Sequence, residues 1–176
     1  MGPGHNPLLG TWKLRSLTWV DAETGKQSTS FGIHPVGYLN YSSDGRVMAV
    51  LLAENRVAPG GAIPSDSEAA ALFKTMVGYT GMFTVQGNQV THNVDASWNE
   101  AWTGTQLIRS YKLDGNSLTI TTAQARYETT GRLGVATLVW ERIRGGEAAA
   151  ATNRHNYLGT RRTVRCVEDF PGQGLG

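Results

Sequence analysis

Three side chains in the middle of the sequence could act together on a bound small molecule: His92, Arg109 and Tyr111. Alternate side chains of a β-strand point to opposite faces, so in LIRSYKL (107–113) Arg109 and Tyr111 share a face with two leucines. In VTHNV (90–94), His92 shares a face with two valines. If these runs are neighbouring strands, an imidazole, a guanidinium and a phenol converge on one apolar wall, as is typical of a small-molecule site.

Arg109 and His92 could each act on a bound molecule, but each could also have a purely structural role. A guanidinium does not lose its proton, so an inward-facing Arg109 predicts an anionic guest held by charge-assisted hydrogen bonds. The alternative is a structural ion pair with Asp95, Glu100 or Glu141. His92 could exchange a proton with a substrate, or it could be a hydrogen-bonded core residue.

Five aromatic side chains could line the same pocket, because tryptophan and tyrosine combine a large apolar area with one polar group. They are Tyr38, Tyr79, Trp98, Trp102 and Trp140. Each could instead be an ordinary core residue of a β protein. Together with the polar groups, they predict a site for a flat hydrophobic or aromatic molecule.

The sequence predicts neither a metal site nor a cofactor. The histidines His5, His34, His92 and His155 have no i, i+2 or i, i+4 spacing that would place two on one metal ion. The single cysteine, Cys166, leaves no C-x-x-C pair. No P-loop, dinucleotide-binding fingerprint or nucleophile elbow is present.

The elements that must position these groups are short strands. Between residues 9 and 143, strand-like runs alternate with turn signals, as in a meander of antiparallel strands. Hairpin turns are predicted at 44–45, 87–88 and 114–116, where Gly, Asn and Asp supply the required backbone conformations. About seven or eight strands result, which is the number that closes a barrel around one small ligand.

One helix interrupts the strands. Ser65 and Glu68 form an S-x-x-E capping box, and apolar side chains then share one face until Gly78. We predict a helix over residues 66–77. It either forms a lid or plug across one end of the barrel or packs on the outside, because periodicity identifies an apolar face but not its partner.

The chain is predicted to form one barrel domain, residues 1–144, and a C-terminal tail, residues 145–176. Neither helical nor strand periodicity is sustained in the tail, so we expect it to be partly disordered or packed on the barrel. Two long apolar strands, VMAVLLA and ATLVW, indicate that some outer surface is covered by the tail or by a partner. A homodimer is therefore one expectation.

The composition predicts a folded protein that binds neither nucleic acid nor membranes. The net charge is +2 and the basic residues are scattered, so no phosphate-binding stripe is present. No apolar run approaches the roughly 20 residues that cross a bilayer. The first ten residues lack the basic and apolar regions of a signal peptide. Since one cysteine forms no disulfide framework, a cytoplasmic location is expected.

Several stretches form an ordered series: GTWKL, FGIHPVGYLNYSSDGR, GYTGMFTV with THNVDAS, WTGTQLIRSYKLDG and TLVWERI. Together they cover residues 8–144 and resemble the lipocalin-like domain family of bacteria and fungi. The resemblance implies an all-β, up-and-down antiparallel barrel around a ligand cavity. With the strand count and the predicted helix, we expect about eight strands and one short helix near the mouth. Gly10-x-Trp12 is similar to the lipocalin G-x-W signature, which implies that Arg142 or Arg144 packs on Trp12.

Three functions remain open, because a barrel does not by itself fix a function. The first is binding of a small hydrophobic or aromatic, anionic molecule, with Arg109 holding a carboxylate or phenolate. The second is a cofactor-independent cyclase, isomerase or hydratase for a polyketide-like or terpenoid intermediate, with His92 as acid or base and Arg109 and Tyr111 stabilising an oxyanion. The third is haem binding with His92 as axial ligand.

Overall fold

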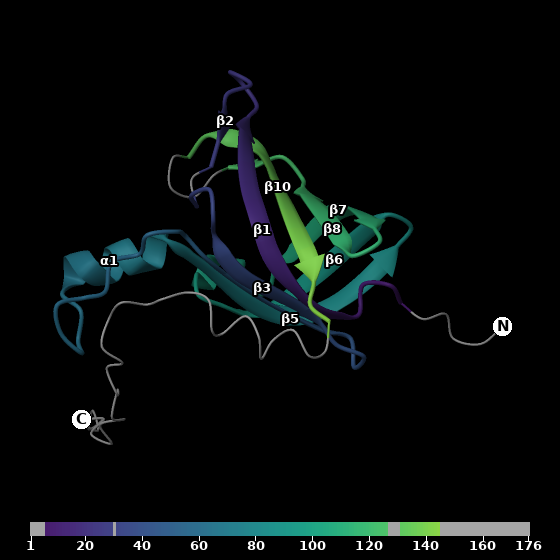
Figure 1. Ribbon diagram of the computed structural model, residues 1–176, viewed down its shortest axis with the longest axis horizontal. Helices are drawn as coiled ribbons and strands as arrows, with labels where there is room; N and C mark the ends of the chain where they lie inside the picture. The colour runs from purple at the N-terminus through teal and green to yellow at the C-terminus, as the bar shows by residue number, and fades with distance from the viewer. Residues whose placement is uncertain (1–5, 30, 127–130, 145–176) are drawn as a thin grey trace.

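The chain folds into an antiparallel β-barrel with one α-helix beside it (Figure 1). The computed structural model describes residues 6–29, 31–126 and 131–144. Its strands are β1 (Gly10–Asp21), β2 (Gln27–Ser28), β3 (Val36–Tyr41), β4 (Arg46–Leu52), β5 (Met76–Gln86), β6 (Gln89–Ser97), β7 (Gln106–Asp114), β8 (Ser117–Thr122), β9 (Ala125–Arg126) and β10 (Leu133–Arg142). Its helices are α1 (Asp66–Lys74) and a short 3₁₀ helix, η1 (Glu100–Trp102). The predicted tail, residues 145–176, lies outside the described residues.

The barrel closes because β1 pairs on both of its edges, with β3 on one side and with β10 on the other. Between these two contacts, β3, β4, β5, β6, β7, β8 and β10 pair in chain order. The eight long strands therefore form a closed up-and-down antiparallel barrel, as the sequence predicts. The two-residue strands β2 and β9 only extend the rim.

The three predicted hairpin turns join consecutive strands of the barrel. Gly45 lies between β3 and β4, Gly87 between β5 and β6, and Gly115 between β7 and β8, with φ angles of 87°, 59° and 56°. Glycine has no Cβ and adopts positive φ at little cost, so these turns follow from the local sequence. The turn at Gly87 makes β5 and β6 neighbours, and the longer connection that contains η1 returns the chain to pair β7 with β6, which brings His92 and Arg109 together.

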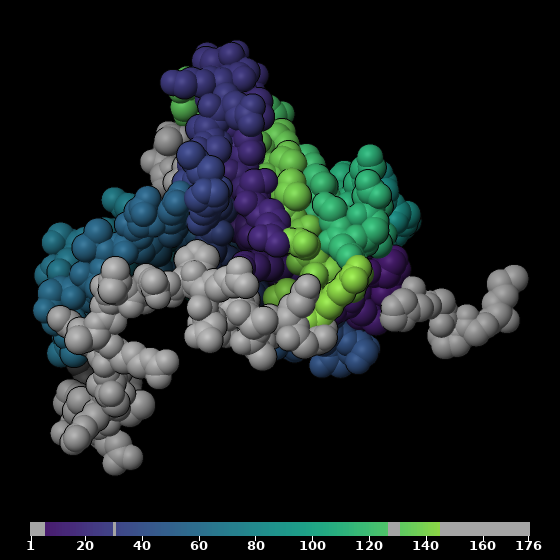
Figure 2. Space-filling view, viewed as in Figure 1, coloured from purple at the N-terminus to yellow at the C-terminus, as the bar shows by residue number. Residues whose placement is uncertain are grey.

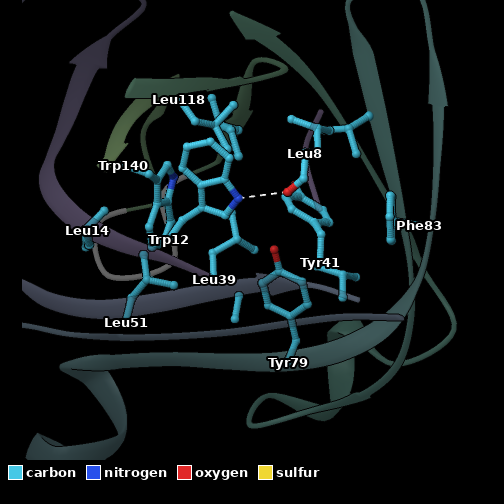
Figure 3. Packing of buried hydrophobic residues seen from close by; sticks show 14 of the residues in the cluster. Leu8, Trp12, Leu14, Leu39, Tyr41, Leu51, Tyr79, Phe83, Leu118 and Trp140 are labelled. Atoms are coloured by element: carbon cyan, nitrogen blue, oxygen red, sulfur yellow. Dashed lines mark hydrogen bonds between the residues drawn. The ribbon is translucent and has the colours of Figure 1, made fainter. Parts of the chain in front are cut away.

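One end of the barrel, which we call the floor, is closed by packed side chains. Its fully buried residues include Leu8, Trp12, Tyr41, Val47, Val90 and Leu118. Trp12 donates from Nε1 to the Leu8 carbonyl over 2.9 Å (Figure 3). The Arg142 guanidinium lies over the indole, with Cζ 4.0 Å from the ring centroid, and also donates to the carbonyls of Pro7 and Leu9. Arg142 is thus the arginine that packs on Trp12.

The helix α1 begins as the sequence predicts and ends earlier. The Ser65 backbone N–H donates to the Glu68 carboxylate over 2.8 Å, and the Glu68 N–H donates to the Ser65 hydroxyl over 3.4 Å, which completes the capping box. The helix ends at Lys74 because the Thr75 carbonyl accepts a hydrogen bond from Ala53 over 2.9 Å, which draws the chain into β5.

The position of α1 falls between the two expected positions. None of its residues is buried, and it projects from one side of the barrel (Figures 1 and 2). Only its last turn reaches the open end of the barrel, where β4 ends and β5 begins. We call this end the mouth. Phe73 and Lys74 in this turn line the cavity, so α1 lies near the mouth without closing it.

Truncating the floor tryptophan should destabilise the protein strongly. We expect Trp12→Ala to lower the free energy of unfolding by about 3–5 kcal/mol, the usual effect of removing a buried aromatic side chain. Urea denaturation followed by circular dichroism measures this change. Ile63, which is 89% exposed, offers a control, and Ile63→Ala should cost less than about 1 kcal/mol. Equal losses in the two variants would contradict the packing described here.

Candidate functional site

The barrel contains a cavity of about 550 Å³ that is open at the mouth. All eight long strands and the last turn of α1 contribute to its lining, which is mostly apolar. The volume lies within the range of about 300–1,000 Å³ that is usual for small-molecule pockets.

The cationic residues of the cavity lining have no acidic counterpart. Lys74 and Arg126 are exposed at the mouth, and Arg109 on β7 is half-buried inside the barrel. No aspartate or glutamate of the described residues lines the cavity. The field of these cations, focused by apolar walls, favours an anionic guest.

Four polar side chains from four strands meet on one wall, and we call them the Arg109 network: Tyr41, Tyr79, His92 and Arg109. His92 on β6 is fully buried. Its Nε2 lies 2.8 Å from the hydroxyl of Tyr41 on β3. Its Nδ1 lies 2.9 Å from the hydroxyl of Tyr79 on β5 and 3.0 Å from Nη1 of Arg109. The same Nη1 also donates to the Tyr79 hydroxyl.

Arg109 determines where the protons of this network lie. A guanidinium offers N–H donors and no acceptor, so Nδ1 of His92 must accept, and the imidazole is the neutral tautomer with its proton on Nε2. Nε2–H then donates to Tyr41, and the single lone pair of Nδ1 is shared by the Tyr79 O–H and the Arg109 N–H in a three-centre hydrogen bond. Both ring nitrogens of His92 are therefore engaged within the network.

Burial and charge both oppose protonation of His92. Desolvation, followed by the nearby Arg109 cation, holds the pKa of the imidazole well below its ordinary value of 6.5. Burial, together with the neighbouring Tyr79 phenol, raises the pKa of Tyr41. His92 and Tyr41 are therefore neutral around pH 7, and the formal charge of the network resides on Arg109.

No carboxylate of the described residues neutralises Arg109. Each predicted partner is engaged elsewhere: Asp95 pairs at 2.7 Å with an arginine of β4, Glu141 pairs with an arginine of β1, and Glu100 accepts from a neighbouring threonine. The Nε and Nη2 atoms of Arg109 have no hydrogen-bond partner in the described part of the chain. A buried charge without a counter-ion is costly, so an anion bound here would be stabilised.

A series of aromatic rings leads from the mouth to Arg109. Between ring centroids, Phe73 of α1 lies 6.0 Å from Trp98, Trp98 meets Trp102 edge-to-face at 4.8 Å, and Trp102 lies 5.9 Å from Tyr79. The Arg109 Cζ atom lies 5.4 Å from the Tyr79 ring centroid. The guanidinium therefore sits beside a broad aromatic surface that suits a flat apolar ligand.

Four of the five predicted aromatic residues line the cavity: Tyr79, Trp98, Trp102 and Trp140. Tyr38 does not, because it lies on the outer face of β3, where it is half exposed. Tyr41, which the sequence prediction missed, points inward from the same strand. Strand alternation could have identified Tyr41, because it shares the inward face of β3 with the apolar Leu39, whereas Tyr38 lies on the opposite face.

Two of the three predicted polar groups, His92 and Arg109, line the cavity, and Tyr111 does not. Tyr111 lies two residues farther along β7, towards the floor, and its hydroxyl donates to the Gly87 carbonyl over 3.1 Å. The expected convergence of three groups is therefore corrected: Tyr79 contributes the phenol beside Arg109. Strand alternation indicates the face of a residue but not its depth in the barrel.

The described residues contain no group of three or more His, Cys, Asp or Glu side chains placed to hold a metal ion. A haem iron would need a free nitrogen of His92, but both nitrogens already have partners. Among the described helices, none has the length and apolar character needed to cross a membrane.

A family model described as a lipocalin-like domain matches residues 9–143, which is most of the chain. The chain belongs to the lipocalin-like domain family. This result confirms the resemblance found in the sequence over nearly the same residues, and it accords with the closed barrel. No match to a curated protein was found for this lipocalin-like protein.

Two solved structures are among those similar to this lipocalin-like protein. A lipocalin-like protein from Bacteroides uniformis is 16% identical, with 78% of this chain and 100% of that chain covered and a TM-score of 0.43. An uncharacterized protein from Bacteroides eggerthii is 14% identical, with 77% and 99% covered and a TM-score of 0.38.

The neutral state of His92 predicts a pH dependence of stability. Below about pH 6.5 the unfolded chain protonates this imidazole, whereas the folded chain, with its lowered pKa, does not. The unfolded state then binds more protons, so the free energy of unfolding falls as the pH falls, by up to about 1.4 kcal/mol per pH unit. Urea denaturation between about pH 7 and pH 5 measures this slope.

His92→Gln is the matched variant, because its amide keeps one acceptor and one donor but cannot be protonated in this range. The stability of the wild type relative to this variant should decrease as the pH falls. A difference that stays constant with pH would contradict a buried, neutral imidazole.

Proposed function

We propose that this lipocalin-like protein binds a small hydrophobic or aromatic molecule with an anionic group inside its barrel. The observation that carries the proposal is Arg109, whose inward-facing guanidinium has two neutral partners and no carboxylate partner in the described part of the chain. An anion beside it would make charge-assisted hydrogen bonds, which are roughly twice as strong as neutral ones.

The remaining lining supports a ligand that is apolar apart from this group. The cavity of about 550 Å³ suits a molecule of drug-like size. Trp98 and Trp102 offer aromatic surface between the mouth and Arg109. Lys74 and Arg126 would attract an anion to the mouth before it enters.

We place binding ahead of the cyclase, isomerase or hydratase activity that the sequence left open. That activity requires His92 to exchange a proton with a substrate, yet both ring nitrogens have partners within the network and the pKa of the ring is lowered. It also requires Tyr111 to stabilise an oxyanion with Arg109, yet the Tyr111 hydroxyl is bonded to a backbone carbonyl. Binding needs neither step.

The proposal predicts that affinity depends on Arg109 only for anionic ligands. We expect Arg109→Met to weaken binding of naphthalene-2-carboxylate by about 10–100-fold, because a hydrogen bond to a charged group contributes about 1.5–3 kcal/mol. Binding of the neutral methyl ester should not weaken. Isothermal titration calorimetry measures both affinities.

Arg46→Met is the matched control, because Arg46 pairs with Asp95 on the outside of the barrel and does not line the cavity. It should leave both affinities unchanged. If the carboxylate binds the wild type no better than its ester, or if the two arginine variants behave alike, the proposed function is wrong.

We also propose that two copies associate through the outer face of β3, β4 and β5. The exposed apolar side chains of this face are Val36, Tyr38, Met48, Val50 and Met82. Tyr38 and Val50 are direct cross-strand neighbours and are 47% and 46% exposed. Contiguous apolar patches of this kind often mark protein contacts, which supports the homodimer expected from the sequence.

Sedimentation equilibrium tests the association. The wild type should sediment as a dimer, and Val50→Lys should be a monomer because a charge at the centre of the contact would be desolvated. Val20→Lys, at a position on β1 that is 38% exposed, should remain a dimer. A wild type that stays monomeric at high concentration would rule the dimer out.

A cytoplasmic location is likewise proposed from the sequence. The chain has a single cysteine, Cys166, so it forms no disulfide within itself, as is usual for proteins of reducing compartments.

A further inference from the structure

We infer that the anionic group of the ligand is a carboxylate, which Arg109 holds with two parallel hydrogen bonds from Nε and Nη2. This inference rests on the proposed function and narrows its ligand class. It selects a planar anion with two oxygens over an anion with one oxygen, such as a phenolate.

The contacts of Arg109 determine which edge of the guanidinium is open. Nη1 donates to the Tyr79 hydroxyl and to Nδ1 of His92, so this nitrogen is engaged within the network. Nε and Nη2 have no partner within the described residues. Their N–H groups lie on the same edge of the planar group and point in parallel, which is the arrangement that binds a carboxylate through two hydrogen bonds.

The network also holds this edge in place. Tyr79 comes from β5 and His92 from β6, so Nη1 is bonded to two neighbouring strands of a closed barrel. Turning the guanidinium would break both bonds. His92 is therefore a positioning residue: its neutral Nδ1 orients Arg109, and a donor fixed in advance loses less conformational entropy when a ligand binds.

A single-oxygen anion fits this arrangement less well. A phenolate accepts from one of the two open N–H groups and leaves the other without a partner in an apolar cavity. Tyr79 cannot supply an additional donor, because its hydroxyl proton is donated to His92. A carboxylate satisfies both open donors at once.

The test compares 4-nitrobenzoate, 4-nitrophenolate and the neutral 4-nitrobenzamide by calorimetry at mildly alkaline pH, where both acids are ionised. We expect 4-nitrobenzoate to bind at least about tenfold more tightly than 4-nitrophenolate, the effect of one additional charge-assisted hydrogen bond. Arg109→Lys keeps the charge but lacks the planar pair of donors. It should lose this preference while both anions still bind more tightly than the amide.

The variants of His92 provide a second readout that does not alter Arg109. His92→Gln retains an acceptor for Nη1 and should keep the preference for 4-nitrobenzoate, whereas His92→Leu should lose it. Thermal unfolding of each variant checks that the barrel is intact.

The possible results separate the two claims. Equal binding of both anions to the wild type, or a preference that survives in Arg109→Lys, overturns the carboxylate inference and leaves anion binding in place. A preference that survives in His92→Leu alone overturns the positioning role of His92. If neither anion binds better than the amide, the proposed function itself fails.

Discussion

The hydrogen bond from Arg109 Nη1 to His92 Nδ1 constrains every other group on the polar wall of the barrel. Because the guanidinium can only donate, the imidazole must present a lone pair, and its proton must lie on the side of Tyr41. Tyr79 then bridges the two, since it accepts from Arg109 and donates to His92. The Arg109 guanidinium, which can only donate, thus fixes the direction of the hydrogen bonds made by side chains on three other strands.

The same contacts explain how the interior holds a positive charge. Two neutral acceptors solvate one nitrogen of the guanidinium, while the surrounding apolar lining supplies no counter-ion from the described residues. This arrangement is not one that stability alone would favour, because an uncompensated charge in a poorly polarisable interior is unfavourable. Departures of this kind are expected where a protein is built to bind something.

A second arginine at the other end of the barrel shows the contrast. Arg142 lies over the Trp12 indole and donates to the carbonyls of Pro7 and Leu9. Both Nη atoms of Arg142 therefore have acceptors from the chain itself, and its role is to close the floor. Within the described part of the chain, only one nitrogen of Arg109, Nη1, has acceptors. The lipocalin-like barrel thus separates a packed floor, which Arg142 closes, from the proposed binding cavity between the network and the mouth.

The sequence alone determined the local features of this protein. Strand alternation and turn residues predicted the closed barrel and its hairpins, the Ser65 and Glu68 pair predicted where α1 begins, and the G-x-W signature predicted that an arginine packs on Trp12. These features depend on neighbours within a few residues or on a family pattern. The inward direction of Arg109 also follows from alternation within one strand.

Only the tertiary structure decided what surrounds those residues. Alternation has a period of two and gives the face of a side chain, so it could not show that Tyr111 lies towards the floor or that Tyr79 reaches His92. The absence of a carboxylate beside Arg109 among the described residues depends on which strands are adjacent and on where Asp95, Glu100 and Glu141 find other partners. These distances are set by closure of the whole barrel, and no local stretch of sequence contains them.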